Sequence, residues 1–364
     1  MSAFPEGNAI IYCEGAFGTT DGKTAHGLVR RTARYRIAAV IDSTLAGRDA
    51  GEITDGKPKG VPVVASFEDA VATAERTGLR ATHFVIGIAP CGGRLPTEGR
   101  LVVKRAIEHG LHVDSGLHDF LSDDPILAEL AQKKGVQIRD IRKTPPRNAL
   151  HAFTGKIDTV GALRIALLGT DSCVGKRTTA WRLVEAYQAQ GIKAEMIGTG
   201  QTAWLQGVET GIILDSLIND FVAGELENAV VTAWEKRRPE VLIVEGQGSL
   251  MNPAFPGGLE ILAATRPHAI VLQHAPARRE YDGFPGFAMH PLKIQIQALE
   301  LVSGRPVVAV TLNHQGIAPE EVPFACETIR RETGLPTVDP LLGDLGQLIH
   351  AVPRLRPGTH REDR

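Results

Sequence analysis

The residues from Gly169 to Thr179 carry the clearest chemical signal in this chain. An apolar run, residues 163–168, leads into Gly169, and a turn then reaches Gly175 and Lys176 at the start of a predicted helix. Glycines let backbone N–H groups converge on phosphate oxygens, while the helix N-terminus and a lysine add positive charge. The pattern predicts a phosphate-binding loop with these candidate contacts: Gly169, Thr170, Ser172, Cys173, Val174, Gly175, Lys176, Arg177, Thr178 and Thr179.

The spacing of this loop departs from the common Walker A pattern. Five residues, instead of four, separate Gly169 from Gly175, and Arg177 stands where a serine or threonine normally binds magnesium. Thr178 is displaced by one position. An added arginine suits a phosphate-rich ligand held by charge and forked hydrogen bonds, and the displaced hydroxyl weakens the case for metal-assisted phosphoryl transfer. We therefore expect phosphate binding without a metal.

Three residues are candidates for acid–base chemistry: Asp171 inside the loop, Glu245 at the end of an apolar run, and His274 at the end of another. In doubly wound sheets the carboxyl ends of the strands form the ligand crevice, so Glu245 and His274 should face the loop. Each also has a structural interpretation. Asp171 could stabilise its own turn, Glu245 could hold Lys176, and His274 could be a satisfied strand-end residue.

Other polar residues near predicted strand and helix ends are candidates for substrate binding. Arginines suit carboxylate recognition, and polar groups after a strand would reach the crevice. Several could instead be exposed charges or helix caps. The candidates are Lys23, Arg30, Gln201, Thr202, Asp220, Arg278 and Arg279.

Short β-branched runs alternate with amphipathic stretches of helix length, which predicts an α/β fold with parallel strands and helical crossovers. The Pro/Arg-rich segment 142–147 interrupts the pattern and is the best linker candidate. We therefore expect two doubly wound open sheets: a Rossmann-like domain over residues 1–145 and a P-loop domain over 146–364. The predicted strands are 9–13, 35–41, 82–88, 112–115, 136–139, 163–168, 193–197, 241–244, 269–273 and 307–311. The predicted helices are 66–77, 97–109, 123–134, 176–190, 225–236, 291–303 and 318–333.

The bulk composition restricts the class of partner. The net charge is −2 and 5% of the residues are aromatic, so the sequence has neither the basic footprint nor the stacking surface of a nucleic-acid binder. No signal peptide or membrane-spanning run is recognisable, and the four cysteines show no CxxC pairing. We expect a cytoplasmic protein that acts on a small molecule and forms a homo-oligomer.

Two resemblances extend this interpretation. The run Gly-Thr-Asp-Ser-Cys-Val-Gly-Lys at 169–176, with Val-Glu-Gly-Gln-Gly at 244–248, is locally similar to dethiobiotin synthetase. Over nearly the whole chain, segments 21–30, 40–47, 115–118, 169–179 and 273–278 resemble a former domain-of-unknown-function family. Its members are D-glutamate (D-amino-acid) N-acetyltransferases. The resemblance implies acetyl-CoA as the acetyl donor, with its phosphates on the loop, and an acidic amino acid, D-glutamate, as the acceptor.

Two other functions remain open at this point. The loop could bind ATP in a ligase or kinase of the dethiobiotin synthetase type. Alternatively, the N-terminal sheet could serve an NAD-dependent oxidoreductase or epimerase, or a nucleotide-binding regulator, with Asp42 at the ribose position. Glu14 to Gly18 carries only part of the dinucleotide fingerprint, which weakens that second alternative.

Overall fold

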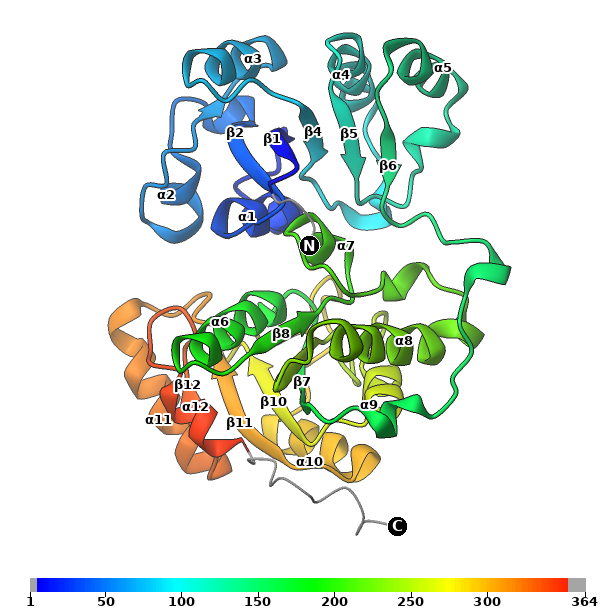
Figure 1. Ribbon diagram of the computed structural model, residues 1–364. Helices are drawn as coiled ribbons and strands as arrows, with labels where there is room; N and C mark the ends of the chain where they lie inside the picture. The colour runs from blue at the N-terminus through cyan, green and yellow to red at the C-terminus, as the bar shows by residue number, and fades with distance from the viewer. Residues whose placement is uncertain (1–4, 353–364) are drawn as a thin grey trace. The chain divides into compact units, whose positions relative to one another are not determined.

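The computed structural model describes residues 5–352, and backbone contacts group them into two compact units (Figure 1). The first unit contains the residues up to Pro145 together with Gln201–Glu209, and the second contains the rest of the chain from Pro146 onward. The outer ends of both predicted domains, residues 1–4 and 353–364, lie outside the described residues.

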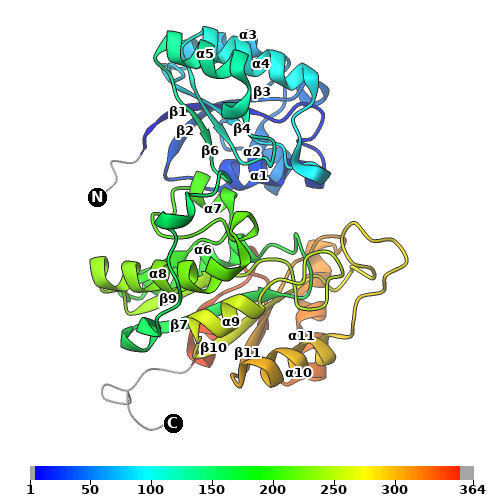
Figure 2. The same cartoon turned by 90° about the vertical axis from the view of Figure 1, so that its right-hand side faces the viewer.

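The first unit is a six-stranded parallel sheet with the order β3-β2-β1-β4-β5-β6. Helices α1 and α2 pack against each other, and α3, α4 and α5 form a second layer on the opposite face of the sheet (Figure 2). The strands are β1 (Gly7–Tyr12), β2 (Tyr35–Ile41), β3 (Val63–Val64), β4 (His83–Ile86), β5 (His112–Ser115) and β6 (Ile138–Asp140). The helices are α1 (Lys23–Arg30), α2 (Ala50–Asp55), α3 (Phe67–Arg76), α4 (Thr97–Glu108), α5 (Pro125–Lys134) and α7 (Gln201–Leu205).

The second unit is also a six-stranded parallel sheet, with the order β12-β11-β10-β7-β9-β8. Helix α12 packs on α6, while α8, α9 and α10 are successive neighbours in another layer. The strands are β7 (Leu163–Gly169), β8 (Ala194–Ile197), β9 (Val241–Glu245), β10 (Ala269–His274), β11 (Val307–Leu312) and β12 (Thr337–Val338). The helices are α6 (Lys176–Ala189), α8 (Asn219–Arg237), α9 (Leu259–Thr265), α10 (Leu292–Ser303), α11 (Val322–Thr333) and α12 (Gly346–Ala351).

Local sequence signals explain several of the helix boundaries. The Ser66 hydroxyl accepts a hydrogen bond from the Asp69 N–H and starts α3. Asp124 caps α5 in the same way through the N–H groups of Ile126 and Leu127, and Gly135 ends that helix in the left-handed region. The predicted α/β fold with two parallel sheets is confirmed.

The compact units depart from the predicted division at α7. The chain leaves β8, forms α7 within the first unit, and returns to the second unit at Thr210. Trp204 lies 3.7 Å below the Arg34 guanidinium, and the Gln206 side-chain amide donates to the carbonyls of Gly27 and Arg31 at 2.7 and 3.0 Å. Leu205 is fully buried in the first unit's core. Apolar burial and these bonds hold α7 there, and no periodicity in the sequence marks it.

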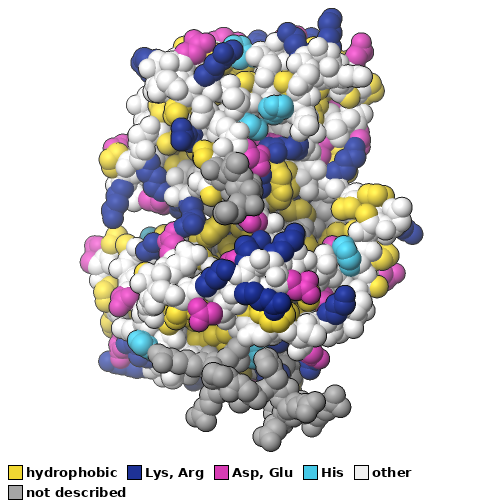
Figure 3. Space-filling model, viewed as in Figure 1, with side chains coloured by type: hydrophobic (Ala, Val, Ile, Leu, Met, Phe, Trp, Pro, Cys, Tyr) yellow, Lys and Arg dark blue, Asp and Glu magenta, His cyan; other side chains and the backbone are white. Residues whose placement is uncertain are grey.

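No described helix is long and apolar enough to cross a membrane. On the face of the molecule seen in Figure 3, Lys and Arg side chains lie interspersed with Asp and Glu side chains.

Candidate active site

The phosphate loop lies between the end of β7 and the start of α6, as the sequence predicted. Gly175 precedes the helix with φ +101°, a conformation that L side chains rarely adopt. A Cβ on Gly169 would lie 3.0 Å from Lys176 Nζ and 2.9 Å from a Val174 methyl. The two glycines therefore allow the close turn that folds Lys176 back over the loop.

Lys176 is buried, and its Nζ donates to the backbone carbonyls of Asp171 and Gly248 at 2.7 and 2.8 Å. Among the described residues it makes no ion pair. Burial lowers the pKa of this lysine to about 8, although the charges of Cys173 and Asp171 partly oppose that shift. A buried ammonium held only by carbonyl groups is a position where an anion would be strongly stabilised.

Asp171 holds the surrounding loops together. One of its oxygens, Oδ1, accepts from the Ser172 N–H and from Asn252 Nδ2, both at 2.7 Å. The other, Oδ2, accepts from Arg278 Nη1 at 2.7 Å and from the Asp282 N–H at 2.8 Å. The carboxylate has no exposed surface. These contacts favour a positioning role for Asp171. If the carboxylate took up a proton, it would lose part of its hydrogen bonding to Arg278 and to the loops that carry Asn252 and Asp282.

Three of the four hydroxyl groups in the loop are committed to protein partners. Thr170 Oγ1 bonds to His274 Nδ1 at 3.0 Å, and Ser172 Oγ donates to Asp282 at 2.9 Å. Thr179 Oγ1 donates to Gln273 Oε1 at 2.5 Å and is fully buried. Only Thr178 is left without such a bond within the part of the chain that the structure describes. The loop therefore offers a single hydroxyl to any ligand or ion.

Glu245 ends β9 beside the loop and is 3% exposed. Its Oε2 accepts from the Thr199 N–H at 3.0 Å, and its backbone carbonyl accepts from the Thr199 hydroxyl at 2.9 Å. Burial raises the pKa of this carboxyl group, while the positive charges of Arg177 and Lys176 oppose that rise. A buried carboxylate with a raised pKa has the character of a general base.

His274 ends β10, the neighbour of β7. Burial lowers its pKa to about 4, so the imidazole is neutral near pH 7. A neutral ring with Nδ1 on Thr170 can accept or donate a hydrogen bond through Nε2, but it is a weak base at this pKa. The structure thus brings all three predicted catalytic residues to the phosphate loop and gives Glu245 the environment best suited to proton transfer.

Of the predicted substrate contacts, Arg278 lies beside the loop and donates to Asp171 and to the Ser172 carbonyl at 2.8 Å. Arg279 is exposed next to it. Asp220 is exposed in the first turn of α8, where its charge complements the helix dipole. Neither Arg279 nor Asp220 has a described contact with the phosphate loop.

The remaining predicted contacts belong to the first unit. Arg30 donates to Asp55 at 2.6 Å and to the Thr54 carbonyl at 3.0 Å. Lys23 is exposed at the start of α1. Gln201 lies against Gly116, and the Thr202 hydroxyl bonds to that of Thr24 at 3.0 Å. These four residues belong to the unit that carries α7.

The dinucleotide alternative meets an obstacle at Asp42. This fully buried carboxylate accepts from the Phe17 N–H at 2.8 Å and from the N–H and hydroxyl of Thr44 at 3.0 and 2.6 Å. Glu14, in the turn after β1, accepts from the Ser43 N–H at 2.9 Å. Backbone N–H groups and the Thr44 hydroxyl of this chain therefore already bind the two carboxylates that would have to accept hydrogen bonds from a ribose.

Sequence reasoning missed several residues that build the site. Gln273 joins the hydroxyls of Thr179 and Thr311 through its Oε1. Asn313, just after β11, donates from Nδ2 to the Val174 carbonyl at 2.8 Å. Asn252 and Asp282 bind Asp171 from separate loops. Gln273 and Asn313 could have been found as polar residues at the carboxyl ends of apolar strands, whereas Asn252 and Asp282 lie in loops without a comparable signal.

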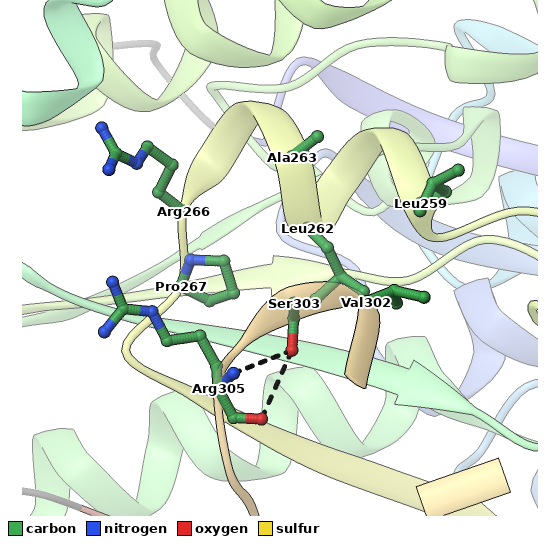
Figure 4. A pocket seen from close by; sticks show the side chains of 8 residues that line it. All are labelled: Leu259, Leu262, Ala263, Arg266, Pro267, Val302, Ser303 and Arg305. Carbon is green, nitrogen blue, oxygen red and sulfur yellow. Dashed lines mark hydrogen bonds between the residues drawn. The ribbon is translucent and has the colours of Figure 1, made fainter. Parts of the chain in front are cut away.

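A separate pocket of about 210 Å³ lies between α9 and α10 (Figure 4). Its arginines, Arg266 and Arg305, come just before β10 and β11. It is therefore at the amino ends of these strands, opposite the edge that carries the phosphate loop. Within residues 5–352, no group of three or more His, Cys, Asp or Glu side chains is arranged to hold a metal ion.

Comparison with known proteins agrees with this architecture. Residues 151–349 match the P-loop domain of the family called domain of unknown function DUF1611, and residues 43–144 match its Rossmann-like N-terminal domain. A crystal structure of a DUF1611 protein from Anabaena variabilis superposes with a TM-score of 0.87 at 32% identity, covering 95% of this chain and 99% of that one.

Two curated relatives are both named D-glutamate N-acetyltransferase. The one from Pseudoalteromonas is 33% identical over 286 residues, 76% of this chain and 82% of the relative. The one from Tritonibacter scottomollicae is 31% identical over 297 residues, 79% of this chain and 84% of the relative. This kinship makes the chain an acyltransferase with N-acetyltransferase function. On domain matches, sequence identity and fold alike, the chain belongs to the DUF1611 family.

Proposed function

We propose that this enzyme transfers the acetyl group of acetyl-CoA to the amine of an acidic amino acid, D-glutamate, and that the phosphate loop holds the coenzyme A phosphates. The name of the two relatives supports the acceptor. The donor is our inference from the chemistry of the loop.

The observation that carries the proposal is the state of Lys176. Within residues 5–352 its buried ammonium has no carboxylate partner, and it lies at a helix N-terminus whose first N–H groups have no intrahelical acceptors. Such a position fits a ligand rich in phosphate. Coenzyme A brings a diphosphate and a 3′-phosphate. Because Thr170, Ser172 and Thr179 use their hydroxyls within the protein, the loop is better suited to phosphate binding than to a metal-bound nucleotide.

The acceptor chemistry requires a base. An amino-acid amine is mostly protonated near pH 7 and must lose a proton before its nitrogen attacks the thioester carbonyl. Glu245 is the group in this cluster whose pKa is raised by burial, which suits it to accept that proton. The new C–N bond then replaces the C–S bond, and coenzyme A leaves as the thiol.

The test is to incubate the protein with acetyl-CoA and a panel of D- and L-amino acids and to follow free thiol release. We expect release with D-glutamate above that with L-glutamate and neutral amino acids. Parallel thermal-shift measurements with acetyl-CoA, with ATP plus magnesium and with NAD identify the ligand of the loop. Thiol release at background level with every acidic amino acid would refute the proposal, and stabilisation by ATP plus magnesium alone would favour the ligase alternative.

A further inference from the structure

Two loops beside the phosphate loop carry three neighbouring aromatic side chains: Phe255 and Phe287, which are exposed, and Phe284, which is half-buried between them. Phe255 follows β9, and the other two follow β10. The ring centroids of Phe255 and Phe284 are 6.4 Å apart and those of Phe284 and Phe287 are 6.1 Å apart, both in edge-to-face geometry. Phe255 is 54% and Phe287 56% exposed. We call these three residues the aromatic cluster.

Phe255 is tied to the phosphate loop through backbone contacts. The Asn252 side chain that donates to Asp171 also accepts from the Phe255 N–H at 2.8 Å. The Phe255 carbonyl accepts from the Ser249 N–H at 3.0 Å, next to the Gly248 carbonyl that binds Lys176. A Cβ on Gly248 would lie 1.9 Å from the Phe255 carbonyl oxygen, so this approach requires glycine.

The second loop is fixed to the same carboxylate. The Asp282 N–H donates to Asp171, and its side chain accepts from Ser172. Tyr281, 4% exposed, donates from its N–H to the Phe287 carbonyl at 3.0 Å and accepts from the Phe284 N–H at 3.0 Å. Asp171 therefore fixes the aromatic cluster to the loop that carries Lys176.

The aromatic cluster and the phosphate loop together suit a ligand that has both an apolar part and a phosphate part. A single exposed apolar side chain is ordinary, but three rings from two loops make a contiguous apolar patch, which marks a binding surface. Its connection to Lys176 indicates that the same ligand also presents phosphate. We propose that the aromatic cluster binds the pantetheine arm and the acyl group of the donor thioester, whose methyl and methylene groups suit phenyl rings. This inference rests on the proposed function and assigns a second subsite for the donor.

The experiment compares two ligands that share all three phosphates. Coenzyme A carries the pantetheine arm, and adenosine 3′-phosphate 5′-diphosphate lacks it. Dissociation constants for both are measured by calorimetry with the wild-type protein, Phe287→Ala, Phe255→Ala and the conservative Phe287→Leu. The control is Leu301→Ala on α10, which removes an apolar side chain that is 85% exposed and precedes the pocket-lining Val302.

We expect Phe287→Ala and Phe255→Ala to weaken coenzyme A binding about five- to thirtyfold and to leave the shorter nucleotide within about twofold. Phe287→Leu should recover most of the affinity, and Leu301→Ala should change neither ligand. Unchanged coenzyme A affinity, or equal weakening of both ligands, overturns the proposal. So does a change in oligomeric mass by sedimentation without a change in coenzyme A affinity, because the patch would then be a subunit contact.

The two proposals fail in different ways. If the wild-type protein releases thiol with D-glutamate but the phenylalanine variants bind coenzyme A as it does, only the aromatic subsite is overturned. If the wild-type protein binds neither ligand and releases no thiol, the proposed function is overturned with it.

Discussion

Replacing Asp171 by asparagine should destabilise the P-loop unit. The carboxylate accepts four hydrogen bonds, two on each oxygen, from Ser172, Asn252, Arg278 and Asp282. An asparagine oxygen can keep one pair, but its NH₂ group then faces the donors of the other pair. The variant therefore loses two bonds and leaves the Arg278 side chain, 15% exposed, without its counter-ion.

The size of this effect follows from the bonds lost. Hydrogen bonds to a charged group contribute about 1.5–3 kcal/mol each, and removing one partner of a buried ion pair costs about 3–5 kcal/mol. We therefore expect the free energy of unfolding to fall by about 3–5 kcal/mol, a large part of a typical total of about 5–15 kcal/mol.

Chemical denaturation of the wild type, Asp171→Asn, Arg278→Gln and the double variant measures the loss and the coupling. The double variant should be more stable than the sum of the single losses predicts, by about 1–3 kcal/mol. Arg278→Lys, which keeps the charge but loses the planar fork, gives a milder perturbation if Asp171→Asn does not fold. A loss below about 1 kcal/mol together with a kcat reduced by ~10²–10⁴ would refute this reasoning and make Asp171 the catalytic base.

Four further outcomes are expected. Lys176→Ala should weaken acetyl-CoA binding more than about tenfold in calorimetric titrations. In the wild type the affinity should decline as the pH rises through about 8 and Lys176 loses its proton, and Lys176→Arg should abolish that decline. Lys236→Ala, at an exposed position, is the control in the same titrations. Glu245→Gln should lower kcat by ~10²–10⁴ with little change in donor affinity, whereas the exposed Glu235→Gln on α8 should leave kcat unchanged in the thiol assay. Acetyl transfer should persist in excess EDTA, and activity lost on chelation and restored by magnesium would contradict the metal-free loop. The pKa of His274 is near its ordinary value of 6.5 in the unfolded chain and about 4 in the folded protein, so the free energy of unfolding should decrease as the pH is lowered from about 6.5 to about 4. His274→Asn should flatten this part of the stability curve, as measured by urea titrations.

The elements that the sequence predicted well are those with strong local signals. β2 and β5 begin and end at the predicted residues. An apolar, partly β-branched run bounded by polar residues defines β2. The phosphate loop was predictable since few structural needs place Gly-Lys directly before a helix. α2 and α9 were not predicted, because each is short and has no clear amphipathic repeat.

The predicted site was incomplete because its organisation is set by tertiary contacts. The position of Asp171 in the loop predicts a role at the site, but its four donors come from residues as distant in sequence as Asp282, and no local pattern indicates them. Gln201 and Thr202 directly follow the loop after β8 in the sequence. Burial of the neighbouring Leu205 in the first unit's core determines that this segment folds with the first unit.

The path of α7 limits how this protein can be divided or recombined. A fragment cut near residue 145 would lose a piece of its own hydrophobic core, since Leu205 lies in that core and Trp204 packs against it. The complementary fragment would carry the same segment with its apolar side chains exposed to water. Domain shuffling at the apparent linker would therefore yield two damaged halves, whereas exchange that moves residues 201–209 with the first unit would keep both cores intact.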